Sequence, residues 1–117
     1  MLYISRAKFR IELGDNQGAL QDSNIAIKLA PESDSAYNNR GVVRFNSGDK
    51  QGALQDYNKA IQLNRKNATA YYNRAEVRYG LGDKQGAIKD WQLAANLHLE
   101  QGNTKKYAEA IEKINGM

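Results

Sequence analysis

Apolar and polar positions along this chain recur with the period of amphipathic helices, interrupted by short Gly-Asp turns. Before the middle turn, Tyr37, Gly41 and Phe45 recur every fourth residue. After the turn, small and apolar residues return at helical spacing, at Ala53, Leu54, Tyr57, Ala60, Ile61 and Leu63. Such spacing places these residues on one face of each helix. The pattern therefore predicts a helical hairpin around the turn.

The turn itself repeats without insertions. Its glycine stands at Gly14, Gly48 and Gly82, thirty-four residues apart each time, and Gln-Gly-Ala follows each Gly-Asp pair after one residue. Glycine readily adopts the left-handed conformation that ends a helix, and the aspartate after it can accept hydrogen bonds from the amides that open the next one. A phosphate-binding loop would continue as Gly-Lys-Ser or Gly-Lys-Thr, which none of the three turns does. The turns therefore indicate structure and not nucleotide binding.

A 34-residue helix-turn-helix unit of this kind resembles the tetratricopeptide repeat family, and the resemblance covers nearly the whole chain. With the turn glycine as position 15, the family's large residue at position 4 and small residue at position 8 are matched by Tyr3, Tyr37, Tyr71, Ala7, Gly41 and Ala75. Its small residues at positions 20 and 27 are matched by Ala19, Ala53, Ala87, Ala26, Ala60 and Ala94. The resemblance implies an all-α fold: a right-handed superhelix, or solenoid, of antiparallel helix pairs, with seven helices.

We expect three repeats and a final helix, over residues 1–33, 34–67, 68–101 and 102–117. The first repeat is truncated at its N-terminal end because Met1 already falls at position 2. The family's proline at position 32 occurs only as Pro31, so the last helix of the third repeat should continue to about Gln101.

The C-terminal segment should form a capping helix over residues 105–115, with Thr104 as its N-cap. Its apolar positions recur at helical spacing, at Tyr107, Ala108, Ile111 and Ile114. Such a helix would cover the apolar face that the last repeat of a solenoid leaves open.

The net charge of +4, from 17 Lys and Arg against 13 Asp and Glu, is explained largely by a repeated set of arginines and aspartates. Arginine occupies positions 7 and 11 of every repeat and aspartate occupies position 23, at Arg6, Arg10, Asp22, Arg40, Arg44, Asp56, Arg74, Arg78 and Asp90. Positions 7 and 11 share a helix face, and the antiparallel second helix brings position 23 beside it. These residues predict a ladder of Arg-Asp pairs, which accounts for +3 of the +4 and disfavours nucleic-acid binding as the reason for the basic character.

The composition excludes several kinds of chemistry. The chain of 117 residues is the size of one domain, and it has no cysteine for a disulfide, a thiolate nucleophile or a cysteine-ligated zinc. Its only histidine, His98, has no partner at metal-ligand spacing. We therefore expect no catalytic residue, no metal and no cofactor. No apolar run is long enough to cross a bilayer, and we expect a cytoplasmic protein that binds no membrane.

In the resembled family the first helices of the repeats line a concave groove that binds peptides. The positions that would line it here are Ile4, Lys8, Ile11, Asn38, Asn39, Val42, Phe45, Tyr72, Asn73, Glu76 and Tyr79. The aromatic and apolar residues among them would be solvated unless a ligand covers them, or they could fill the groove against one another. Asn39 and Asn73 could bond either a ligand backbone or the neighbouring helix. The family's clamp for the C-terminal carboxylate of chaperones is not reproduced at these positions.

These observations predict a non-catalytic protein-protein interaction module that binds a peptide or protein segment in this groove. The alternative is a structural role: self-association as a homodimer through the uncovered N-terminal helix, or service as one segment of a longer repeat protein. The identity of the partner is not written in the sequence.

Overall fold

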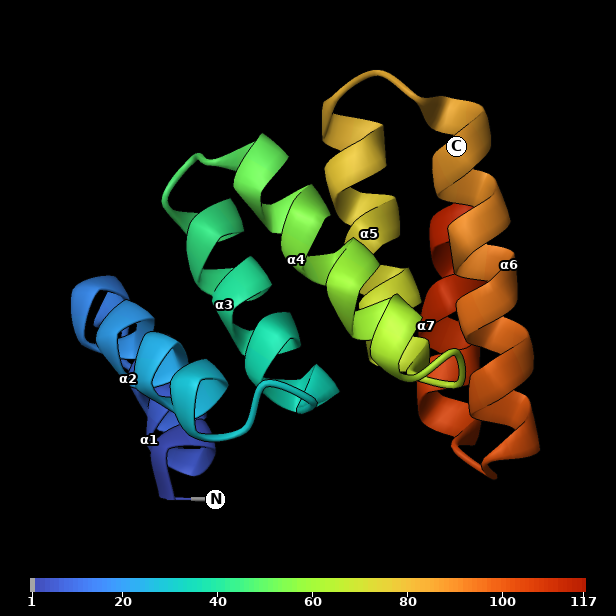
Figure 1. Ribbon diagram of the computed structural model, residues 1–117. Coiled ribbons are helices and arrows are strands. Elements are labelled where there is room, and N and C mark those ends of the chain that lie inside the picture. The colour runs from blue at the N-terminus through green and yellow to red at the C-terminus, as the bar shows by residue number, and fades with distance from the viewer. Residues whose placement is uncertain (1) are drawn as a thin grey trace. The chain divides into compact units, whose positions relative to one another are not determined.

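The computed structural model describes residues 2–117, and within that range the chain forms seven α-helices and no strand. They fall into two compact units that divide after Arg65, and Figure 1 labels each helix. The helices of the first unit are α1 Leu2–Glu12, α2 Asn16–Leu29, α3 Asp34–Asn46 and α4 Lys50–Leu63. Those of the second unit are α5 Ala68–Gly80, α6 Lys84–Glu100 and α7 Thr104–Asn115. The all-α fold class is confirmed, and the expected repeat boundaries at residues 33, 67 and 101 fall between helices.

Each Gly-Asp turn joins two helices as its chemistry predicts. The backbone of Gly48 has a φ of 89°, and the carboxylate of Asp49 accepts a hydrogen bond of 2.9 Å from the backbone amide of Gly52. Gly52 lies inside α4, where a Cβ atom would collide with that carboxylate, so the close approach of the cap requires glycine. The turns after α1 and α5 repeat this arrangement with Asp15 and Asp83 as N-caps.

Small residues at position 8 let the paired helices approach closely. Ala7 and Ala75 are completely buried. At Gly41 a Cβ atom would lie 2.5 Å from the ring of Tyr57, so this aromatic side chain of α4 fills the space directly above the backbone of α3. The glycine and the tyrosine are therefore complementary parts of one contact, as expected of a packing position.

The expected Arg-Asp pairs form in all three helix pairs, each as a triad of two arginines and one buried aspartate. In α3 and α4, Arg40 makes two hydrogen bonds to Asp56, of 2.9 and 3.0 Å, and Arg44 adds a third of 3.1 Å. The other two triads consist of Arg6, Arg10 and Asp22, and of Arg74, Arg78 and Asp90. The ladder residues predicted from the sequence are thus confirmed as ion pairs.

A tyrosine lies against the first arginine of each triad. The guanidinium carbon of Arg40 lies 5.6 Å from the ring centroid of Tyr37, and the equivalent pairs in the other repeats, Arg6 with Tyr3 and Arg74 with Tyr71, lie at 5.1 and 5.4 Å. These distances fit cation–π contacts. The large residue at position 4 therefore holds the arginine in place as well as filling space.

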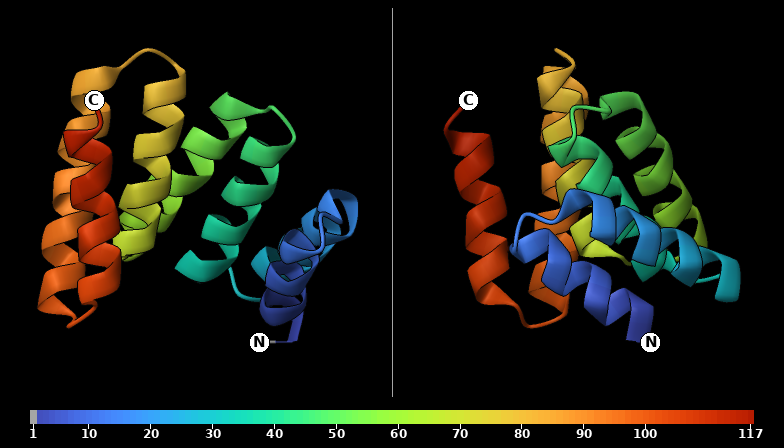
Figure 2. Two further views of the ribbon diagram at one scale, coloured as in Figure 1. Left: turned by 180° about the vertical axis from the view of Figure 1, so that it is seen from behind. Right: turned by 90° about the vertical axis from the view of Figure 1, so that its left-hand side faces the viewer.

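The last two helices differ from the sequence expectation in detail. Helix α6 has 17 residues against 14 in α2 and α4, and it ends at Glu100, close to the predicted end at Gln101. The N-cap of α7 is Asn103 and not Thr104, because the Asn103 side chain accepts the hydrogen bond from the amide of Lys106. On α7, Ala108 is exposed whereas Ala110 is buried, so that part of the predicted apolar face was wrong. The two views of Figure 2 show α7 running beside α6.

Candidate functional site

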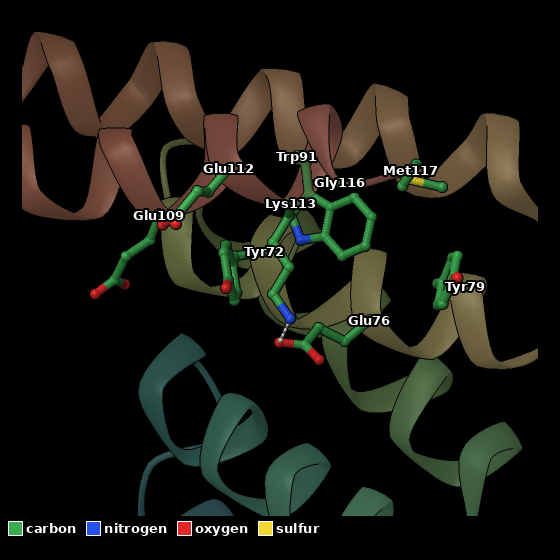
Figure 3. A pocket seen from close by; sticks show the side chains of 9 residues that line it. All are labelled: Tyr72, Glu76, Tyr79, Trp91, Glu109, Glu112, Lys113, Gly116 and Met117. Carbon is green, nitrogen blue, oxygen red and sulfur yellow. Dashed lines mark ion pairs between the residues drawn. The ribbon is translucent and has the colours of Figure 1, made fainter.

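Three of the expected groove residues share one face of α5, and in the structure they line a cavity. Tyr72, Glu76 and Tyr79 follow one another at helical spacing, so their side chains leave α5 on the same side. The cavity has a volume of about 440 Å³ (Figure 3). Its remaining lining comes from α6 and from the C-terminal segment, through Trp91, Glu109, Glu112, Lys113, Gly116 and Met117.

The cavity has an aromatic wall. The ring of Trp91 lies 6.4 Å from that of Tyr72 and 6.1 Å from that of Tyr79, measured between centroids. Trp91 is only 3% exposed and belongs to the core with Ala75 and Ala87, whereas Tyr79 is 48% exposed. A rigid buried ring therefore supports a tyrosine that a ligand can reach.

The polar groups of the cavity are mostly acidic. Glu76, Glu109 and Glu112 face it together with a single ammonium, that of Lys113, whose Nζ lies 3.9 Å from Glu76 Oε1. The pKa of the Tyr72 phenol is raised above its ordinary value, first by burial and then by the charges of these three glutamates. Negative charge thus dominates the electrostatics around Tyr72.

A smaller cavity of about 120 Å³ also borders Tyr72, and its other lining residues are Thr69, Asn73, His98, Lys106 and Glu109. His98 is buried, and its Nδ1 has no hydrogen-bond partner. Burial, followed by the charge of Lys106, lowers the pKa of His98 below its ordinary value, while Glu109 acts in the opposite direction. Among residues 2–117, no group of three His, Asp or Glu side chains could hold a metal ion.

The other seven expected groove residues belong to the first unit. Asn39 donates a hydrogen bond of 3.3 Å to the carbonyl of Ile4, so its amide bonds the neighbouring helix, which is one of the two roles expected for it. Lys8 is exposed, and the others are half-buried on α1 and α3, namely Ile4, Ile11, Asn38, Val42 and Phe45. Of the four residues in the second unit, Tyr72, Glu76 and Tyr79 line the larger cavity, and Asn73 lines the smaller one.

Sequence reasoning missed six of the nine residues that line the larger cavity. Trp91 is not among the residues expected to bind, yet it lies in the core and also lines the cavity. The acidic residues of α7 were overlooked because that helix was interpreted only as a cover. Their spacing carried the signal, because Glu109, Glu112 and Lys113 stand at i, i+3 and i+4 and so share one helix face.

Comparison with known proteins agrees with the fold. A family model described as TPR repeat matches residues 43–82. None of the curated proteins matches the sequence. Within residues 2–117, no helix is both long enough and apolar enough to span a membrane.

Several solved structures share the fold over almost the entire chain. The type III secretion translocator chaperone SycD of Yersinia enterocolitica is similar with a TM-score of 0.91 at 15% identity, over 99% of this chain and 87% of that one. PcrH in complex with the chaperone binding region of PopD has a TM-score of 0.91 at 19% identity, over 98% and 87%. The first TPR of Spaghetti (RPAP3) bound to the HSP90 peptide SRMEEVD has a TM-score of 0.79 at 20% identity, over 97% and 91%.

Proposed function

Because the chain carries tetratricopeptide repeats, we propose that it is a non-catalytic protein-interaction module that binds a peptide or protein segment. Two structures of the same fold support this proposal, since PcrH and the Spaghetti domain were each solved with a bound protein region or peptide. At such low sequence identity, the likeness supports a common fold but not a common ligand. The partner therefore has to be deduced from the residues of this chain.

The observation that carries the proposal is the aromatic cavity on α5. Tyrosine and tryptophan supply most of the binding energy in many interfaces because they bury a large area at little entropic cost. Here Tyr79 is exposed beside the fixed ring of Trp91. That the seven expected groove residues of the first unit also contact the ligand remains a prediction. The experiment described next tests it by replacing Phe45.

The test starts with random peptides that are displayed on phage and selected for binding to the purified protein. The affinities of the selected peptides are then measured by calorimetry. Alanine at Phe45, Tyr72 and Tyr79 should weaken binding by more than about 1 kcal/mol for at least two of the three. Lys89→Ala is the control, because Lys89 is exposed on α6 and lies outside the cavity. Normal binding by the triple variant, with its helicity unchanged, would contradict the proposal.

Self-association is the second candidate function, favoured by apolar side chains on α1 and the turn after it. Phe9 is 60% exposed, and Leu2 and Leu13 are each 67% exposed. Exposed apolar side chains gathered on one helix are typical of a protein-protein contact. Light scattering over a wide concentration range tests this role: a dimer that Phe9→Glu dissociates would support it, and a strict monomer would exclude it.

A further inference from the structure

The cavity on α5 has a charge opposite to that of the protein around it. Three carboxylates and one ammonium line it, which gives a charge of −2 within a chain of net charge +4. Such a local reversal of sign attracts a ligand of positive charge, and the attraction is strongest where part of the surroundings is apolar. The cavity therefore fits a cation better than an anion.

Its carboxylates are also incompletely neutralised. Lys113 approaches Glu76 at 3.9 Å, the dashed line in Figure 3, with both side chains partly exposed. Within residues 2–117, neither Glu109 nor Glu112 takes part in a salt bridge. Two carboxylates thus remain available to a basic group that enters the cavity.

The phenol of Tyr72 experiences this negative field directly. Its pKa is raised by burial and then by Glu76, Glu109 and Glu112, because ionisation would add a fourth negative charge beside three others. A positive charge at the same place would be stabilised by the same groups. The C-terminal end of α7, whose last carbonyls carry partial negative charge, contributes Lys113 and Gly116 to the lining and acts in the same direction.

The aromatic wall adds a second kind of cation recognition. Tryptophan and tyrosine rings attract ammonium and guanidinium groups placed over their faces. The Nε1 hydrogen of Trp91 is a buried donor with no acceptor, and Figure 3 shows that nitrogen on the side of the ring toward Tyr72 and Lys113. A peptide can supply both a basic side chain for the carboxylates and rings and a carbonyl oxygen that accepts a hydrogen bond from Trp91.

We propose that the cavity between α5 and α7 binds a lysine or arginine side chain of a peptide, with the charged end among Glu76, Glu109 and Glu112 and against the tyrosine rings. This inference rests on the proposed function and names the chemistry of the segment that is bound. The volume of about 440 Å³ lies within the range of small-ligand sites and accommodates one such side chain with its backbone. The ammonium of Lys113 would compete with the basic side chain of the peptide for these carboxylates.

The experiment uses the peptides selected from the random library. They should be enriched in lysine or arginine, and replacing that residue by methionine, which keeps the apolar stem, should weaken binding roughly tenfold. The chain has one tryptophan, so its fluorescence and its indole N–H resonance report on this cavity alone. A downfield shift of that resonance on binding would mark the new acceptor.

Charge variants of the protein provide the matched test. Glu109→Gln and Glu112→Gln should each weaken binding about three- to tenfold, and Lys113→Gln should strengthen it about threefold, with both effects smaller at high salt. The controls are Glu100→Gln and Lys105→Gln, which make the same charge changes at exposed positions outside the cavity. Both controls should leave the affinity unchanged.

The outcomes separate this inference from the function on which it rests. Peptides that need Tyr79 but contain no basic residue would overturn the inference and leave the proposed function standing. Acidic peptides that lose affinity in Lys113→Gln would overturn it in favour of an anion site. If no peptide binds, both fail.

Discussion

Carboxylates occupy two contrasting environments in this protein, the triads between paired helices and the cavity between α5 and α7. The triad aspartates are buried, and each is held by two arginines, as Asp56 is by Arg40 and Arg44. The cavity glutamates are more exposed, and within residues 2–117 the single lysine among them pairs with Glu76 alone. The same chemical group is thus satisfied internally in one place and left open in the other.

The difference separates stability from binding. A buried aspartate with two guanidinium partners has its hydrogen bonds completed before any ligand arrives, so it can specify only how two helices meet. A carboxylate without a counterion is available to a partner. The position of the arginines therefore indicates which acidic residues maintain the fold and which are free to bind.

Among the variants that test this comparison, Asp56→Ala should cause the largest loss of unfolding free energy. It leaves two guanidinium groups without their shared counterion between helices, and losing one member of a buried pair typically costs roughly 3 to 5 kcal/mol of unfolding free energy. Urea denaturation of this variant, of Arg40→Ala, of Arg44→Ala and of the double variants would yield the coupling energies. Couplings near zero for both arginines would show that the triad does not stabilise the fold.

Asp22→Ala should cost less, because its triad is more open to water. The side chain of Arg6 is 42% exposed against 19% for Arg40, so water can hydrate the guanidinium that the substitution strands. We expect a loss of about 1 to 3 kcal/mol in the same urea experiment. A loss equal to that of Asp56→Ala would mean that solvent access does not set the cost.

The Asp22 triad should also lose its contribution in acid. The hydrogen bond from Arg6, more than the charges of Arg10 and Arg6, holds the pKa of Asp22 below its ordinary value. Its folded pKa is thus below the unfolded one, so the contribution is complete above about pH 4 and is lost as the pH falls through the folded pKa. Asp22→Ala should flatten this part of the stability profile relative to the parent protein.

Titration of His98 should change the stability of the fold by a smaller amount than the Asp22 triad does, and in a higher pH range. Burial first, then Lys106, lowers its pKa, so the fold favours the neutral imidazole. Stability should therefore be complete above about pH 6.5 and fall as the pH drops toward the folded pKa of His98. The loss between pH 7.5 and pH 5 should be smaller in His98→Leu, as measured by urea denaturation, and an identical loss in both proteins would contradict the assignment.

Glu112→Gln should have the smallest effect on stability. The carboxylate has like-charged neighbours in the cavity and no salt bridge within residues 2–117, so removing its charge should change the unfolding free energy by less than about 0.5 kcal/mol. The difference between the stability losses of Glu112→Gln and Asp56→Ala is the most direct test of the contrast between cavity and triad carboxylates. A large destabilisation by Glu112→Gln would place that residue with the structural carboxylates.

The triads could be predicted from the sequence because three copies of the repeat fix their register. Once Gly14, Gly48 and Gly82 are aligned, the antiparallel helix pair determines which positions meet, and the structure places Arg40 and Asp56 in contact as expected. The Gly-Asp turns were predictable for the same reason. Periodicity supplies the long-range information that a single helix lacks.

Only three of the nine residues that line the larger cavity were predicted, because most of the others lie on α7 and the segment after it, which follow no repeat. The buried face of α7 could be inferred only from its own apolar spacing, and that spacing misplaced one position, because Ala110 is buried and Ala108 is exposed. Asn103 and Thr104 are neighbouring residues that can both cap a helix, so their sequence alone did not decide between them. The spacing of Glu109, Glu112 and Lys113 shows that they share a helix face, but only the structure shows that they line a cavity with Tyr72 and Tyr79 of α5.

Each triad draws its three residues from one helix pair, and this has an evolutionary consequence. Arg40, Arg44 and Asp56 lie within seventeen consecutive residues, so any copy of the segment carries its own counterions. Duplication or deletion of whole 34-residue units would strand no buried charge, whereas an insertion or deletion of another length between Arg44 and Asp56 would move the aspartate away from the arginines. The triads thus permit the length of the gene to change in whole repeats, and they penalise a change of any other length between the two helices.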